Sequence, residues 1–236
     1  MTQPAPPVET HPYEHLADKA QKTAATTDPH PILITLTRTW HFRDIPPEQF
    51  PSSHFLISGG SILFASIQAP LRVCLIYHKA RGEWLLPKGR KDRGENVTDA
   101  AVRETSEETG YPCELLPLDM VTRAPAAGAQ TTDAAMAVHG SEEPFMVTLR
   151  RTQEGGVQLL SWFASVCTEG AEKGVRSGLQ TEVEDYESAF FEVQEAMRVA
   201  TFEVDRVVIA RAVELVRGTY PSARDILEGV QQLCRL

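Results

Sequence analysis

Two short apolar runs restrict the chain to folds that contain a buried sheet. Residues 61–67 (SILFASI) and 72–78 (RVCLIYH) are rich in aliphatic and β-branched side chains and are separated by Ala69 and Pro70. Half-exposed strands alternate apolar and polar residues, whereas strands that are covered on both faces are nearly continuously apolar. We therefore expect two strands that are buried on both faces.

The order of the remaining patterns indicates a layered domain. We expect a helix over 96–109 that Gly110 ends, strands over 113–122, 144–150 and 157–166, and helices over 193–199, 204–216 and 222–233. Residues 124–143 and 168–179 are polar and contain glycine, and they are typical of long surface loops. Strands around a central helix, with helices last, make an α+β or α/β layered domain.

The N-terminal region has a different character. Residues 1–30 are rich in Pro, Thr, Ala and His without a sustained period, and they are typical of a mobile extension. A strand is expected over 31–42, followed by a proline-containing linker to residue 54. The main domain then covers 55–218, and residues 219–236 supply a C-terminal helix that packs on it.

Composition excludes several classes of protein. The 236 residues carry a formal net charge of −9, which argues against a protein that binds nucleic acid through its phosphates. No stretch approaches the ~18 apolar residues of a membrane span, and the N-terminus lacks the pattern of a secretory signal. The four cysteines are far apart and show no zinc-ligand spacing, which favours reduced thiols in the cytosol or the nucleus.

One helix carries an unusual group of acidic residues. On a helical wheel, Glu104, Glu107 and Glu108 continue the side that begins as the apolar stripe of residues 97, 100 and 101. Like charges at these spacings repel one another, and they lie toward the negative end of the helix dipole. A bound divalent cation with oxygen ligands, Mg²⁺ or Mn²⁺, would relieve both costs. Arg103 can reach Glu107 and Glu95 and so orient the ligands, although a solvated glutamate-rich helix face would also fit the helix alone.

The loop before this helix is basic. Lys88, Arg90, Lys91 and Arg93 lie within or just before the turn that Gly89 and Gly94 bracket. Cations beside a metal-binding carboxylate cluster suit a diphosphate or polyphosphate. The basic run by itself is more typical of a solvated turn than of a phosphate-binding site.

The whole segment resembles the Nudix box. Its seven fixed positions are all present, as Gly89, Glu95, Arg103, Glu104, Glu107, Glu108 and Gly110. Thr105 and Tyr111 depart from the commoner aliphatic residues, at positions that touch no proposed ligand. The resemblance implies the Nudix fold, an α/β/α sandwich around a mixed sheet, and hydrolysis of a diphosphate linkage in a nucleoside diphosphate derivative or a related polyphosphate.

The resemblance also implies roles for individual residues. It makes Glu104, Glu107 and Glu108 ligands of Mg²⁺, with Mn²⁺ as a substitute, and adds the backbone carbonyl of Gly89. Glu95 is expected to pair with Arg103 rather than to bind metal. The general base stays open between a box glutamate, Glu107 or Glu108, and a residue of a later acidic loop, for which Glu184 is the candidate.

The sequence before the motif favours some classes of substrate without identifying one. Trp84 with the following Pro-Lys-Gly is similar to the lead-in of diadenosine polyphosphate hydrolases, and related sequences occur in diphosphoinositol polyphosphate hydrolases and in the mRNA-decapping subunit. The two small-molecule classes are favoured, with decapping and prenyl-diphosphate hydrolysis as alternatives. A non-catalytic module that senses a nucleotide or binds a protein is the alternative of another class.

Further phosphate contacts are expected from Arg150, Arg151, Lys173 and Arg176, and stacking from Tyr186 and Phe202. Nucleic acid and membrane are not expected as partners, the location is expected to be cytosolic or nuclear, and the oligomeric state stays open.

Overall fold

The computed structural model describes residues 47–129, 134–153, 155–170, 173–174 and 186–224. Its strands are β1 (Phe55–Phe64), β2 (Arg72–His78), β3 (Glu83–Leu85), β4 (Lys88–Arg90), β5 (Cys113–Leu115), β6 (Leu118–Thr122), β7 (Met136–Ser141), β8 (Met146–Arg151), β9 (Val157–Cys167) and β10 (Tyr186–Glu192). Its helices are α2 (Val97–Thr109), α3 (Val193–Val199) and α4 (Glu203–Thr219), and a 3₁₀ turn covers Pro221–Ala223.

Eight of these strands form one mixed sheet within the described ranges. The order along its main path is β10-β2-β1-β9-β5, with β3 beside β2, β4 beside β1 and β8 beside β9. β1 and β9 run parallel over ten residue pairs, from Phe55 opposite Val157 to Phe64 opposite Val166, and the other pairs are antiparallel. β6 and β7 form a separate antiparallel hairpin.

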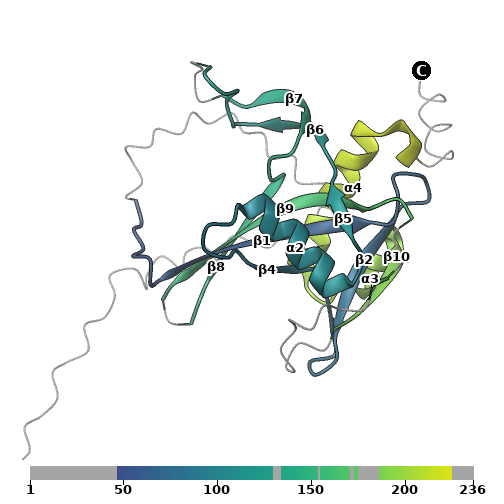
Figure 1. The fold of residues 1–236 in the computed structure, drawn as a ribbon, viewed down its shortest axis with the longest axis horizontal. Coiled ribbons are helices and arrows are strands. Elements are labelled where there is room, and N and C mark those ends of the chain that lie inside the picture. Colours follow the sequence, from purple (N-terminus) through teal and green to yellow (C-terminus); the bar gives the residue numbers. More distant parts are fainter. Residues whose placement is uncertain (1–46, 130–133, 154, 171–172, 175–185, 225–236) are drawn as a thin grey trace, which may run out of the picture. The chain divides into compact units, whose positions relative to one another are not determined.

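Helices cover both faces of the sheet (Figure 1). On one face the hydroxyl of Ser61 in β1 forms a hydrogen bond of 2.8 Å with Thr105 of α2 and one of 2.6 Å with Ser165 of β9. On the other face, Ile62 and Phe64 of β1 belong to the core that α3 and α4 close with residues such as Ile209. Because successive residues of a strand point to opposite faces, the continuous apolar run of β1 is explained by burial on both sides. The α/β sandwich around a mixed sheet is therefore confirmed.

Gly59 in β1 lets α2 approach the sheet closely. A Cβ atom at Gly59 would lie 2.6 Å from the carbonyl oxygen of Val97 and 2.8 Å from the nitrogen of Ala101, which is closer than real Cβ contacts. The first turns of α2 therefore contact the strand backbone directly. Sequence reasoning missed the role of Gly59, although a glycine inside a strand pattern was the available signal.

Most element predictions agree with the structure, and some do not. The helix predicted over 96–109 is α2, with Asn96 as its N-cap and Gly110 in the left-handed region at φ 78°. The long loop predicted over 124–143 is wrong in part, because β7 lies within it. The helix predicted over 193–199 is α3, but the strand β10, which continues to Glu192 directly before it, was not predicted.

Other predicted segments fall outside the described residues. These are the extension over 1–30, the strand over 31–42, most of the loop over 168–179, and the helix over 222–233 except for its first residues, of which 222 and 223 belong to the 3₁₀ turn. No helix in the described part of the chain is long and apolar enough to cross a bilayer.

Candidate functional site

The acidic residues of α2 do not all share one environment. Ala100, Ala101 and Thr105 are fully buried, and Glu108 extends this buried side at 9% exposure. The side chains of Glu104 and Glu107 are 16% and 29% exposed. The side that begins as core therefore does end in carboxylates, but Glu107 lies nearer to solvent than the other two.

Arg103 joins four backbone and side-chain groups of the site. Its Nη1 donates to Glu104 at 2.9 Å and to Glu107 at 3.0 Å. Its Nε and Nη2 donate to the two carboxylate oxygens of Glu95 at 2.8 and 3.1 Å, and Nη2 also donates to the carbonyl oxygen of Arg90 at 3.0 Å. The predicted pairing of Glu95 with Arg103 is thus present, and it is bidentate.

The electrostatics of this pair follow from the same contacts. The hydrogen bond from Arg103 lowers the pKa of Glu95 below its ordinary value, and the hydrogen bond to Glu95 raises the pKa of Arg103. Both groups therefore remain charged at neutral pH, and the guanidinium supplies one fixed positive charge among three carboxylates.

Gly89 is required by the position of Glu104. A Cβ atom at Gly89 would lie 1.9 Å from the carboxyl carbon of Glu104 and 1.9 Å from its Oε2 atom. Only a residue without a side chain therefore lets this carboxylate rest against the backbone of β4. The first glycine of the motif and its first helical glutamate are in direct contact.

Glu108 is directed to the same strand by a different contact. Its Oε2 atom accepts a hydrogen bond of 2.8 Å from the backbone N–H of Lys88. The three carboxylates are thus divided, with Glu104 and Glu107 around the Arg103 guanidinium and Glu108 at the start of β4. No group of three His, Cys, Asp or Glu side chains in the described ranges is arranged as a closed set of metal ligands, which differs from the expected convergent trio.

The basic residues are distributed around β4. Lys91 donates its backbone N–H to the carbonyl oxygen of Ile57 at 3.0 Å and its Nζ to that of Asp92 at 2.8 Å. Arg93 is exposed in the turn before α2. The Cβ atom of Lys88 lies close against Gly60 of β1, where a Cβ atom would approach it to 2.7 Å.

Several residues predicted to act on the substrate have other partners or fall outside the described residues. Arg151 pairs with Glu48 and lies over the Phe50 ring. Lys173 lies 5.6 Å from the centre of the Tyr111 ring, beyond the end of α2. Glu184 and Arg176 fall outside the described residues.

The structure also shows the surroundings of the aromatic residues that the sequence singled out. Trp84 packs against Tyr77 and Phe191, each with ring centres 5.0 Å apart, and lies partly buried against the hydrophobic core. Tyr186 packs edge-on against His78 at 5.2 Å, and Phe202 is 43% exposed at the start of α4.

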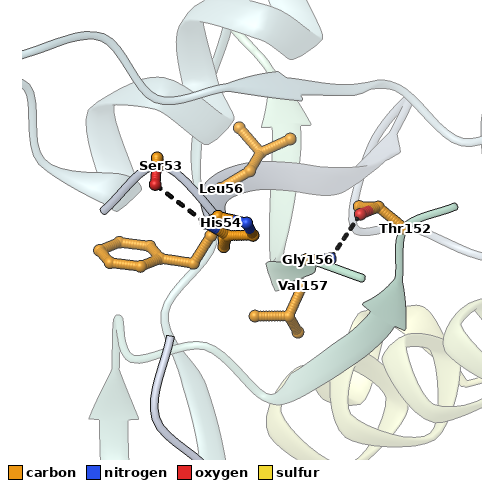
Figure 2. A pocket seen from close by; sticks show the side chains of 7 residues that line it. Ser53, His54, Leu56, Thr152, Gly156 and Val157 are labelled. Carbon is orange, nitrogen blue, oxygen red and sulfur yellow. Dashed lines mark hydrogen bonds between the residues drawn. The ribbon is translucent and has the colours of Figure 1, made fainter. Parts of the chain in front are cut away.

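A pocket of about 210 Å³ lies apart from this group of carboxylates. Figure 2 shows it at the N-terminal ends of β1 and β9, where Ser53 and His54 share a hydrogen bond of 2.9 Å. Its lining residues are Ser53, His54, Phe55, Leu56, Thr152, Gly156 and Val157. None of them is an acid or a permanent cation, so this pocket is not the site for the predicted chemistry.

Comparison with known proteins gives a family match. The family model described as NUDIX domain matches residues 67–212. A Caenorhabditis elegans protein named as a nudix hydrolase is 50% identical over 38 residues, which are 16% of this chain and 10% of that protein. An 8-oxo-(d)GTP phosphatase of Mycolicibacterium smegmatis is 33% identical over 73 residues, which are 27% of this chain and 23% of that protein. The aligned stretches thus span at most about a quarter of these relatives.

Among solved structures, a C. elegans Ap4A hydrolase binary complex is similar with a TM-score of 0.46 at 14% identity. The similarity covers 69% of this chain and 98% of that one.

Proposed function

The chain belongs to the NUDIX family, and from this premise we propose that it is a divalent-metal-dependent hydrolase of a diphosphate linkage in a small molecule. The observation that carries the proposal is the contact between Gly89 and Glu104 beside Arg103. It brings the first glycine of the motif and its first helical glutamate, which are separated by a loop and half a helix, to one place on the sheet.

The residues present fit a divalent cation. Glu104 and Glu107 already lie around a single positive nitrogen of Arg103, so this region of α2 is an environment that stabilises positive charge. The carboxylates offer oxygen ligands, which Mg²⁺ and Mn²⁺ prefer. We propose that Glu104, Glu107 and Glu108, with the carbonyl oxygen of Gly89, hold the metal.

The chain's own residues then have distinct tasks. A bound divalent ion would polarise the phosphoryl oxygens and lower the pKa of an attacking water. Arg103 keeps two of the carboxylates oriented, and the N–H of Lys88 fixes the third. Glu107 or Glu108 accepts the proton of the attacking water, and Glu184 stays the candidate from the later loop.

We propose a polyphosphate as the substrate, with diadenosine polyphosphates and diphosphoinositol polyphosphates favoured. Lys88 and Arg90 of β4 and the following Lys91 offer cations next to the carboxylates, and displacement at phosphorus depends mainly on such positioning and charge neutralisation. Nucleoside triphosphates are tested as further candidate substrates, because one relative is named an 8-oxo-(d)GTP phosphatase.

The experiment is phosphate or nucleotide release from a panel of diphosphate compounds, with Mg²⁺ and with chelator. The panel includes diadenosine polyphosphates, diphosphoinositol polyphosphates, oxidised and normal nucleoside triphosphates, capped RNA and prenyl diphosphates. Metal-dependent turnover of a polyphosphate supports the proposal. Tight binding of one compound without turnover of any would instead identify a non-catalytic binding module.

A further inference from the structure

Two cysteines lie directly opposite one another on neighbouring strands of the sheet. Cys113 is the first residue of β5 and Cys167 is the last residue of β9, and the antiparallel register of the two strands pairs them. Both thiols are free. Because the two residues are far apart in the sequence, their spacing gives no sign of this pair, and only the fold brings them together.

A hydrogen bond next to the pair shows which type of cross-strand pair it is. The N–H of Thr168 donates to the carbonyl oxygen of Pro112 at 3.0 Å. In an antiparallel ladder a bond at this place flanks a pair whose own N–H and C=O groups do not bond to each other. The Cα atoms of such a pair are about 4.5 Å apart, and disulfides join Cα atoms that are about 4.4–6.8 Å apart. The backbone at Cys113 and Cys167 therefore has the separation that a disulfide requires.

The two side chains lie on the face of the sheet that α2 covers. The Sγ atom of Cys113 shares a hydrogen bond of 3.4 Å with the hydroxyl of Ser106 and lies 3.8 Å from the carbonyl oxygen of Val102, both in α2. Ser165, two residues before Cys167, belongs to the hydroxyl network beneath the same helix, and residues two apart in a strand share a face. A disulfide would therefore need only the Cys113 sulfur to turn from its α2 contacts toward Cys167.

The surroundings of the pair keep both thiols protonated at neutral pH. Each side chain is half-buried. Burial raises the pKa of Cys113, and burial together with the nearby Cys113 thiol raises the pKa of Cys167 to about 11, with the positive charge of Arg72 acting in the opposite direction. Because the thiolate is the attacking form, thiol–disulfide exchange here is slow at neutral pH and faster in mildly alkaline solution.

We propose that Cys113 and Cys167 are a redox modification site, at which a small-molecule disulfide such as oxidised glutathione links β5 to β9. One protein thiolate attacks a sulfur of the oxidant, whose S–S bond breaks and releases one glutathione thiolate. The second protein thiolate attacks the protein sulfur of this mixed disulfide and releases the second glutathione. The two protons of the protein thiols pass to the two glutathione thiolates, so the protein pair is oxidised and one glutathione disulfide is reduced. This proposal does not depend on the proposed hydrolase function.

The link would also change the stability of the protein. It would close the stretch of chain that contains β6, β7 and β8. A disulfide that fits the native geometry stabilises a protein mainly by restricting the unfolded chain. We expect the midpoint of thermal unfolding of the oxidised protein to lie about 4–15 °C above that of the reduced protein, and dithiothreitol to reverse this shift.

The experiment treats the full chain with excess oxidised glutathione at mildly alkaline pH, blocks the remaining thiols and maps the linked peptides by mass spectrometry. In the wild type we expect a peptide pair that joins Cys113 to Cys167. Cys74→Ala is the matched control, because Cys74 is fully buried in β2 and lies opposite Phe190 rather than a cysteine; it should form the same link. Cys113→Ser and Cys167→Ser should form no such link and should carry glutathione on the remaining thiol of the pair.

Three results would overturn the proposal. The first is an unmodified pair, or glutathione adducts on Cys113 and Cys167 without a link between them. The second is a link from either cysteine to a different cysteine in the wild type. The third is an oxidised wild type whose midpoint of unfolding is no higher than that of the reduced protein, because the disulfide would then not fit the native strands. Should Cys74→Ala not fold, the peptide map and the unfolding midpoint of the wild type decide alone.

Discussion

Replacement of Arg103 by alanine should destabilise the protein much more than removal of an ordinary surface arginine. The side chain of Arg103 is 30% exposed, and its partners Glu95 and Glu104 are 14% and 16% exposed. Exposed ion pairs contribute up to about 1 kcal/mol, whereas breaking a buried pair costs about 3–5 kcal/mol. For this partly buried network we expect a loss of about 2–3 kcal/mol, which corresponds to about 4–12 °C in the midpoint of thermal unfolding for a chain of this size.

The assay is thermal unfolding of the wild type, Arg103→Ala and Arg211→Ala at neutral pH. Arg211 is the matched control, because it forms a single helical pair with Glu214 at 2.7 Å and the two side chains are 37% and 68% exposed. Its loss should cost less than about 1 kcal/mol. An Arg103→Ala midpoint equal to that of Arg211→Ala would refute the reasoning.

The same variant has a defined pH dependence. Arg103 lowers the folded-state pKa of Glu95, so this stabilisation is complete above the unfolded glutamate value of about 4.3 and is lost as the pH falls through the lower folded-state value. The difference in midpoint between wild type and Arg103→Ala should therefore narrow below about pH 4. A difference that stays constant down to pH 2 would contradict the assigned cause.

Two further predictions concern activity. Glu107→Gln and Glu108→Gln should each lower turnover by about 100-fold or more while the fold stays intact, because each removes a proposed ligand or base. Steady-state kinetics on the best panel substrate measures the turnover, and circular dichroism checks the fold. Wild-type turnover of Glu108→Gln would contradict the prediction. Gly89→Ala should lower activity similarly, because a Cβ atom there would lie 1.9 Å from the Glu104 carboxylate. Gly218→Ala is the control, because a Cβ atom at Gly218 would meet no atom within 4 Å. Equal activity of the two variants would refute the role of the contact between Gly89 and Glu104.

Local patterns predicted the elements that local residues determine. The helix over 96–109 was predictable because Gly110 ends it in the left-handed region and small residues at 100 and 101 mark its buried side. β1 and β2 were predictable from continuous apolar runs. β7 was missed because it pairs with β6 alone and consists of Met, Ala, Val, His, Gly and Ser, which give a weak strand signal.

The details of the site depend on contacts that sequence spacing does not contain. The helical wheel placed Glu104, Glu107 and Glu108 on one side of the helix. It could not show that Arg103 binds the first two and that the Lys88 N–H binds the third. The resemblance therefore named the candidate residues of the site, and only the fold shows which groups hold each of them.

The most direct measurement is calorimetric titration with Mn²⁺ at neutral pH of the wild type and of a variant with Glu104 and Glu107 both replaced by glutamine. We predict saturable binding of Mn²⁺ to the wild type that is lost in the variant. Absence of binding to the wild type, with or without a polyphosphate, or equal binding to both proteins, would contradict the claim that these carboxylates hold a divalent cation.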